Sequence, residues 1–167
     1  DDLNTKVPRV LAVLDPLKVT IQNYEGDGEE IDAPYYPHDV PKEGSRKIPF
    51  SREIYIERDD FMENPPKDYF RLTPEQAVRL RHGYIIVCKE IIKDADGNIV
   101  EIKAEYLPDS KSGSDTSGAK VKSAIQWVSA KEAKTVEVRL YDRLFKDESP
   151  EGLEDINSDS LRVIKNA

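Results

Sequence analysis

The chain has 167 residues, with 25 Lys and Arg against 33 Asp and Glu, and its formal net charge is -8. This length allows one medium domain or two small ones with a buried core. So acidic a chain is not expected to attract nucleic acid non-specifically, because phosphate binding depends on Lys and Arg, and any nucleic-acid site must be local. No apolar stretch reaches the roughly 18–20 residues that span a bilayer, and the start DDLNTKVPR lacks the regions of a signal peptide. We therefore expect a cytoplasmic protein with no membrane partner.

Alternation of apolar and polar residues with a period of two predicts strands along much of the chain. In LKVTIQNY, for example, Leu17, Val19 and Ile21 share one face. Helical periodicity is scarce: RDDFMENPP, residues 58–66, allows one short helix that the two prolines must end, and SAKEAK, residues 129–134, allows a second turn. The predicted strands are residues 10–14, 17–24, 50–57, 78–82, 100–106 and 136–145.

Many short strands joined by polar turns indicate an all-β fold with one or two short helices, either a barrel or a sandwich, and this length favours two sheets or two β-barrels. The segment PDSKSGSDTSGAK, residues 108–120, is rich in Ser, Gly and Asp and has no large apolar side chain. We interpret it as a flexible loop between two domains. The first barrel would comprise residues 1–107, and residues 121–167 would begin a second barrel that is incomplete at its C-terminal end.

The sequence offers no framework for catalysis or metal binding. Cys88 lies in the apolar run YIIVC, which favours a buried structural thiol. His38 and His82 are the only histidines, and neither has a Cys or a second His at ligand spacing. DADGN, residues 94–98, resembles the opening of a calcium loop, but its flanks alternate as strands, which favours a hairpin turn. Since the motifs of phosphate-binding loops and nucleophile elbows are also missing, we expect no catalytic residue, no metal site and no cofactor bound by these residues.

One segment departs from the acidic background. Across residues 64–93 six Lys and Arg stand against three Asp and Glu, a local charge of +3. If residues 78–82 form a strand, Arg79 and Arg81 project side by side from one of its faces. Arg71 approaches from the preceding segment, beside two aromatic rings.

Two interpretations of this basic segment are open from the residues alone. Arginine forks bind phosphates and base edges through paired hydrogen bonds, and the rings of Tyr69 and Phe70 can stack on unpaired bases, which suits single-stranded RNA. Alternatively, the arginines pair with Glu53, Glu57 or Glu75 on an ordinary solvated strand face, because surface ion pairs are common.

Five segments, read in order, carry a resemblance to a known family. They are PRVLAVLDPLKVTIQNY, GSRKIPFSREIYIERDDFMENPPKDYFRLTPEQAVRLR, KDADGNIVE, IQWVSAKEA and VRLYDRLF. Together they resemble the anticodon-binding region of the glutaminyl-tRNA synthetases. The resemblance implies a proximal and a distal β-barrel that bind the anticodon stem-loop of tRNA(Gln). It implies no DNA partner. It also implies a monomeric parent enzyme, a glutamine-tRNA ligase that uses ATP and Mg²⁺ in a catalytic domain outside these residues.

The resemblance further implies roles for individual residues. Arg79 and Arg81 in AVRLR would hold the first anticodon base. Arg71 in YFRL would hold the third base, and Arg9 in PRVLAVLDP would contribute to the central uridine. A bidentate arginine contact to a base edge contributes roughly 1–3 kcal/mol of discrimination. The predicted RNA-binding residues are Arg9, Lys67, Phe70, Arg71, Arg79 and Arg81.

The chain departs from the family pattern at three places. Asp68 stands where a neutral or basic residue is usual, and Gln126 stands where His is usual. The loop APYYPHDVP differs from the family's PNHP-like loop, so His38 has no assigned place. Two other functions fit the pattern: a stand-alone β-barrel that binds RNA or protein, and the equivalent region of a eukaryote-type glutamyl-tRNA synthetase.

Overall fold

The computed structural model describes residues 2–167, so Asp1, the start of the predicted first barrel, lies outside the described residues. The chain divides into two compact units, Asp1–Ala133 and Lys134–Ala167. The first unit begins with a short helix, α1 (Asp2–Lys6), and contains strands β1 to β9. The second unit contains β10 (Val138–Tyr141), a 3-10 turn at Leu153–Asp155, and β11 (Leu161–Ile164).

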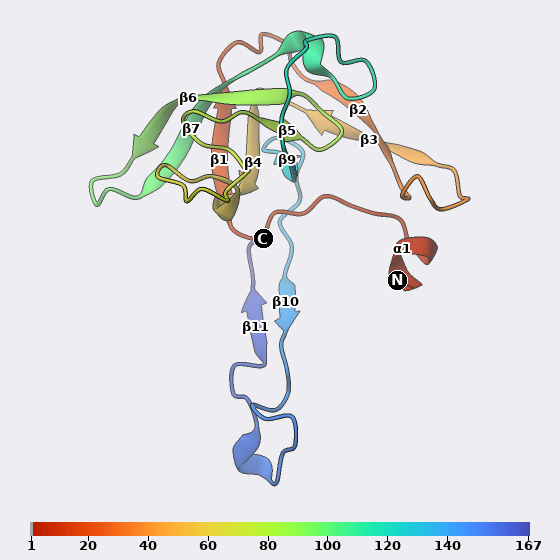
Figure 1. The fold of residues 1–167 in the computed structure, drawn as a ribbon, viewed down its shortest axis with the longest axis vertical. Helices are drawn as coiled ribbons and strands as arrows, with labels where there is room; N and C mark the ends of the chain where they lie inside the picture. Colours follow the sequence, from red (N-terminus) through yellow and green to blue (C-terminus); the bar gives the residue numbers. More distant parts are fainter. Residues whose placement is uncertain (1) are drawn as a thin grey trace. The chain divides into compact units, whose positions relative to one another are not determined.

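Seven strands of the first unit form one sheet, in the order β8-β5-β6-β7-β1-β4-β9 (Figure 1). The two edge strands, β8 and β9, are consecutive in the chain and only Gln126 separates them. Because one residue joins the two edges, the sheet curls into a nearly closed barrel. The prediction of an all-β fold is confirmed. The strands of this sheet are β1 (Pro16–Ile21), β4 (Glu53–Glu57), β5 (Val78–Leu80), β6 (Ile85–Lys93), β7 (Ile99–Tyr106), β8 (Ala124–Ile125) and β9 (Trp127–Ser129).

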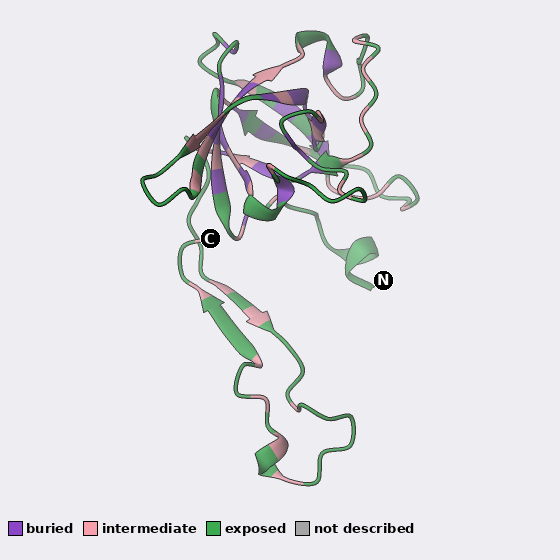
Figure 2. Ribbon diagram, turned by 60° about the vertical axis from the view of Figure 1, so that its left-hand side comes forward, coloured by how far each residue is buried: buried purple, intermediate pink, exposed green. Residues whose placement is uncertain are grey.

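A separate two-stranded sheet pairs β2 (Glu29–Pro34) with β3 (Ser45–Phe50) in antiparallel register. One face of this hairpin is buried, as the purple segments of the first unit show in Figure 2. Phe50 at the end of β3 packs edge-to-face on Trp127 of β9, with ring centroids 5.4 Å apart. The hairpin therefore shares its core with the barrel, and its connecting loop, residues 35–44, stands beyond that core.

Five of the six predicted strand segments contain a strand of the structure. Burial follows the predicted alternation, since Leu17, Val19 and Ile21 of β1 are all in the core. The strand predicted at residues 10–14 is wrong, because its backbone pairs with side chains instead of a neighbouring strand. The Ala12 amide donates to Gln126 Oε1 at 3.4 Å, and the Leu14 amide donates to Glu57 Oε1 at 2.5 Å.

The helix predicted within residues 58–66 is present only as one 3-10 turn, Arg58–Asp60. The predicted hairpin turn at residues 94–98 is confirmed: the Asp94 carboxylate accepts the Asn98 amide at 2.8 Å, and Gly97 adopts a φ of 85° that suits glycine. Cys88 is buried, as expected for a structural thiol, and burial raises its pKa.

The segment 108–120, predicted to be a flexible linker, is fastened to the barrel. It begins with a 3-10 turn, Pro108–Ser110, and Ser110 is fully buried. After it, β8 and β9 complete the first sheet, and the first compact unit continues to Ala133. Within residues 2–167 no helix is long and apolar enough to cross a membrane.

Candidate nucleic-acid interface

A cavity of about 600 Å³ opens on the first unit. Its lining comes from α1 and the segment after it, from the β2–β3 hairpin, from the turn after β5, and from Gln126. The volume lies within the range of pockets that hold small organic ligands. Among residues 2–167, none of those that line the cavity is Asp or Glu. The charged and polar residues of the lining are Asn4, Arg9, Tyr36, His38, Arg46, Arg81, His82 and Gln126.

Arg9 reaches this cavity from the extended segment that follows α1. Its backbone N–H donates to the Tyr35 carbonyl at 2.9 Å, which fastens the segment to the β2–β3 hairpin. Its guanidinium Nη2 donates to Asn4 Oδ1 at 3.1 Å. With this one neutral partner among the described residues, most of the guanidinium donors face no acceptor of the described chain and can meet a ligand.

Arg81 lies in the turn directly after β5, and the fold holds its backbone on both sides. Its N–H donates to the Ile125 carbonyl at 2.9 Å. Its carbonyl accepts the indole N–H of Trp127, also at 2.9 Å. The side chain is left exposed at the cavity, so a rigid backbone presents a free guanidinium.

His82 has a backbone conformation that L-residues rarely adopt, with a φ of 65°. A non-glycine residue in this region costs on the order of 1–3 kcal/mol and is found preferentially at functional sites. Burial lowers the pKa of His82, and the positive charges of Arg81, Arg46 and Arg9 lower it further. The imidazole is therefore neutral at pH 7 and can both donate and accept a hydrogen bond at the cavity.

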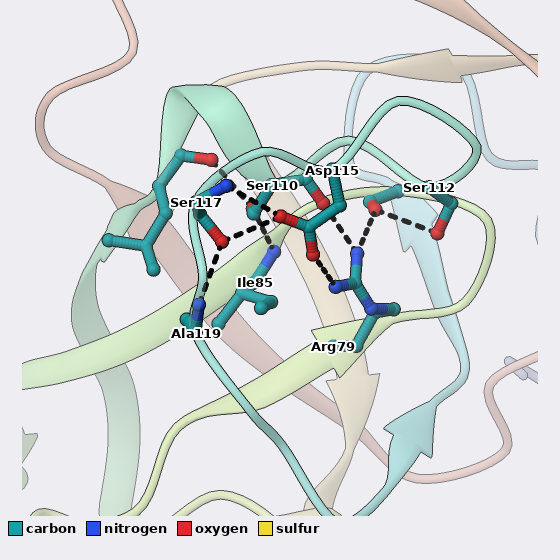
Figure 3. A network of polar contacts seen from close by, with 9 residues as sticks. Arg79, Ile85, Ser110, Ser112, Asp115, Ser117 and Ala119 are labelled. Atoms are coloured by element: carbon teal, nitrogen blue, oxygen red, sulfur yellow. Dashed lines mark hydrogen bonds and ion pairs between the residues drawn. The ribbon is translucent and has the colours of Figure 1, made fainter.

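Arg79 is directed to the segment 108–120 (Figure 3), and it is not among the residues that line the cavity. Its Nη1 donates to the carbonyls of Ser110 and Gly83, and its Nη2 forms an ion pair with Asp115. The structure therefore separates Arg79 from Arg81, which the sequence placed side by side. Three protein acceptors already hold the Arg79 guanidinium.

Arg71 and Tyr69 lie together beside the 3-10 turn Arg58–Asp60. Arg71 Nη1 is 3.1 Å from the buried carboxylate of Asp60. The Tyr69 hydroxyl donates to the Asp59 carbonyl at 3.0 Å, and burial together with the Asp60 carboxylate raises the pKa of Tyr69 to about 12. Half of the Arg71 side chain is still exposed, at 51%, so its outer edge can meet a ligand.

Phe70 and Lys67 lie on the surface close to this pair in sequence. The Phe70 ring is 42% exposed, and Lys122 Nζ stands 4.6 Å from its centroid. Lys67 is exposed. Neither residue lines the large cavity, so the structure distributes the six predicted residues over separate places on the first unit.

Comparison with protein families gives two matches. Residues 7–107 match the family described as tRNA synthetases class I (E and Q), anti-codon binding domain, and residues 124–167 match a second family with the same description. The chain belongs to these anticodon-binding domains. The predicted resemblance is confirmed.

Curated relatives of this anticodon-binding chain include three bacterial glutamine–tRNA ligases. That of Cupriavidus metallidurans is 53% identical over 173 residues, which is 98% of this chain and 29% of the relative. That of Bordetella pertussis is 55% identical over 156 residues, 91% of this chain and 26% of the relative. That of Nitrobacter hamburgensis is 47% identical over 168 residues, 98% of this chain and 30% of the relative. The chain thus spans less than a third of the length of the relatives it matches.

Sequence reasoning on this anticodon-binding chain missed six of the eight charged and polar residues of the cavity, among them two histidines, a glutamine and an arginine. His38 and His82 are far apart in sequence, and only the fold of the β2–β3 hairpin brings both to one lining. Gln126 reaches the cavity because it joins the two edge strands of the barrel. Arg46 was detectable, because it continues the alternation of Ile48 and Phe50. Within residues 2–167 no group of three or more His, Cys, Asp and Glu is arranged to hold a metal.

Proposed function

We propose that this chain binds the anticodon loop of tRNA(Gln) as the anticodon-binding part of a glutaminyl-tRNA synthetase. The parent enzyme would join glutamine to its tRNA in the cytoplasm, act as a monomer, and use ATP and Mg²⁺ in its catalytic part. The observation that carries the proposal is a nucleotide-sized cavity lined by arginines and histidines, with no carboxylate among the described residues of its lining, in a chain of net charge -8.

In this proposal Arg9 and Arg81 make the direct contacts inside the cavity. Arg81 would contact the first anticodon base and Arg9 the central uridine, each through paired donors of its guanidinium. Their free guanidiniums support this assignment. Bases taken into such a pocket must be unstacked from the loop, which is how proteins read single-stranded RNA.

The other predicted residues would act outside the cavity. Arg71 would contact the third base with the exposed edge of its guanidinium while it stays paired with Asp60. Phe70 offers a half-exposed ring on which a base can stack, and Lys67 offers a cation for a phosphate. Arg79 would take part only if the ligand competes with Asp115 for its donors.

The proposal is tested by titrating the 167-residue chain into a fluorescently labelled stem-loop RNA that carries a glutamine anticodon. We expect Arg9→Met and Arg81→Met each to weaken binding by roughly 10- to 100-fold, because each removes charged donors from the cavity. Arg139→Met serves as the matched control, because Arg139 lies in the second unit and pairs with Glu137. Equal affinity of all four proteins would contradict the proposal.

A stem-loop with a glutamate anticodon, which differs in the third base, separates the glutamine enzyme from the glutamate enzyme of the same family. We expect weaker binding to the glutamate stem-loop, and a smaller difference between the two RNAs for Arg71→Gln. A preference for the glutamate stem-loop would favour a glutamyl-tRNA synthetase. Failure to distinguish either RNA from an unrelated stem-loop would favour a barrel with another partner.

A further inference from the structure

Arg46 occupies a core-facing position of β3. The burial pattern along this strand places Ile48 and Phe50 in the core, and Arg46 is the next residue toward the loop on the same face. Its cross-strand partner on β2 is Ala33, which is 0% exposed. The small alanine leaves room for the arginine stem on this face. An arginine in such a position is normally paired, because burying a charge without a partner is costly.

Arg46 has no such partner within residues 2–167. The arginines that form ion pairs are Arg58, Arg71, Arg79 and Arg139. The Nη1 atom of Arg46 is buried and lacks any hydrogen-bond acceptor among these residues. Glu132 and Arg46 both line a smaller neighbouring cavity of about 180 Å³, but the two side chains form no ion pair. The guanidinium instead stands over the Tyr35 ring, 5.7 Å from its centroid.

The unpaired guanidinium belongs to the large cavity. Arg46 lines it together with Arg9 and Arg81, and its charge is one of those that lower the pKa of His82. Three arginines thus lie at one cavity, and within residues 2–167 no carboxylate belongs to its lining. A neutral base would leave these charges uncompensated, whereas an anionic group would neutralise them and supply oxygen acceptors.

We propose that Arg46 binds a phosphodiester group of the RNA whose base enters the cavity. The proposal rests on the proposed function and adds a backbone contact to the base contacts of Arg9 and Arg81. Nη1 would donate to a non-bridging phosphate oxygen, and a second donor of the same planar fork would reach the other oxygen. Phosphate contacts of this kind fix the position of the strand, and base contacts then read it.

An arginine that serves ligand binding can be distinguished by experiment from one that stabilises the fold. Its removal should leave the protein as stable as before or more stable, because a buried unpaired charge is lost, while ligand affinity falls. A structural arginine would behave in the opposite way. Arg46→Met keeps the length of the stem without the charge. Lys47→Met is the matched control, since Lys47 is the next residue of β3, lies on the other face and pairs with Asp32.

The decisive experiment uses the full chain and a series of glutamine-anticodon stem-loops, each with one loop phosphate replaced by a neutral methylphosphonate. We expect Arg46→Met to weaken binding of the unmodified RNA by roughly 10- to 100-fold and to leave the melting temperature equal or higher. A methylphosphonate at one position of the loop should weaken binding to the unsubstituted chain by a similar factor. The same RNA should bind to Arg46→Met almost as well as the unmodified RNA does, because the phosphate contact is already lost. Lys47→Met should match the unsubstituted chain in affinity.

The outcomes separate this proposal from the proposed function. If Arg46→Met binds the RNA normally while Arg9→Met and Arg81→Met do not, the phosphate contact is wrong and the function stands. If every methylphosphonate has the same effect on Arg46→Met as on the unsubstituted chain, Arg46 does not contact a phosphate. If the unsubstituted chain fails to prefer the glutamine stem-loop, both proposals fail.

Discussion

Asp60 is a buried carboxylate, and the one cation paired with it within residues 2–167 is the half-exposed Arg71. Its side chain is 10% exposed, against 51% for Arg71, and Nη1 of Arg71 is 3.1 Å from Oδ1 of Asp60. Burial raises the pKa of Asp60, and Arg71 opposes that rise. The pair therefore has a structural role at the 3-10 turn, in addition to any contact of Arg71 with RNA.

Arg71→Met should lower the free energy of unfolding at neutral pH by about 1–2 kcal/mol. The loss should be smaller than that from breaking a fully buried ion pair, because the Arg71 side chain is half-exposed to solvent. Because the pKa of Asp60 is higher in the folded than in the unfolded chain, Asp60 stabilises the fold most at pH values below its unfolded pKa. This stabilisation is lost as the pH rises through the pKa of the folded state. The deficit of Arg71→Met should therefore be largest at pH 7 and shrink toward pH 4. Denaturant unfolding at both pH values measures it.

The double variant Asp60→Asn/Arg71→Met provides the control. Without a carboxylate to bury, the loss of the cation should cost little, and most of the stability lost in Arg71→Met should return. A deficit that stays constant from pH 4 to pH 7, or that the double variant does not recover, would show that Arg71 stabilises the chain through packing of its stem.

Single residues also show why the cavity could be predicted only in part. Arg9 and Arg81 were named from motifs, but nothing local distinguished them from Arg79. The difference arises because Asp115, 36 residues further along the chain, lies close enough to pair with Arg79. Such long-range pairing is not encoded in periodicity. Arg46 is the exception, since an arginine on the apolar face of a strand is visible in the sequence itself.

At the scale of elements, β5 and the segment 108–120 form one polar unit, which Figure 3 shows at close range. The hydroxyl of Ser110 accepts the Ile85 amide at 2.7 Å and donates to the Leu107 carbonyl at 2.6 Å. The Ser112 hydroxyl donates to the Gly83 carbonyl at 3.1 Å. Arg79 bridges these two parts, so it holds the segment against the turn that carries Arg81 and His82.

Arg79→Met should destabilise the chain by about 1–2 kcal/mol through loss of its bonds to two backbone carbonyls. Asp115→Asn should have a smaller effect, and the double variant should be less destabilised than the sum of the two, because both substitutions break one ion pair. Equilibrium unfolding of the four proteins measures this coupling. Strict additivity would contradict the bridging role.

The same four proteins test the predicted contact between Arg79 and the first anticodon base. If Arg79 contacts RNA, Arg79→Met should weaken RNA binding by the same factor in the unsubstituted chain and in Asp115→Asn. If Arg79 acts only by holding the segment 108–120, Arg79→Met should weaken RNA binding little further in Asp115→Asn, because the ion pair is already broken there. The two roles therefore predict different results from one set of titrations.

Alternation with a period of two identified the central strands of the barrel sheet, but the shorter alternation in β2 and β3 was missed. β1, β4 and β7 each pair with two neighbours and bury one face, so alternation marks them. The run at residues 10–14 is apolar without alternation, and side chains satisfy its amides. β8 and β9 are short, and their place at the edges of the barrel depends on closure of the whole sheet.

At the scale of the whole molecule, the charge of -8 and the basic cavity are compatible. A surface with excess carboxylates repels RNA wherever no arginines are presented, and the described part of the cavity lining presents three arginines without a carboxylate. In the proposed function, RNA would therefore be held only where such arginines are presented. Such a protein gains its selectivity from a few placed donors and not from general attraction to phosphate.

The chain contains two sheets of two strands each, and they differ in burial. The β2–β3 hairpin of the first unit buries Ile31, Ala33, Ile48 and Phe50. The β10–β11 hairpin of the second unit buries no residue, and Tyr141 is 74% exposed (Figure 2). Its cross-strand pairs are joined by backbone hydrogen bonds. A two-stranded ribbon without a buried face is marginally stable in water.

Hydrogen–deuterium exchange on the 167-residue chain should therefore give opposite results for the two hairpins. Amides paired in β10–β11 should open with a free energy of at most about 2 kcal/mol, because local opening exposes almost no additional apolar surface. Amides paired in β2–β3 should be protected nearly as well as those of β6 and β7, because opening them exposes the core around Phe50 and Trp127. The same strand number in both sheets makes each the control for the other. Equal protection of the two hairpins would show that the second unit is stabilised by contacts beyond its own hydrogen bonds.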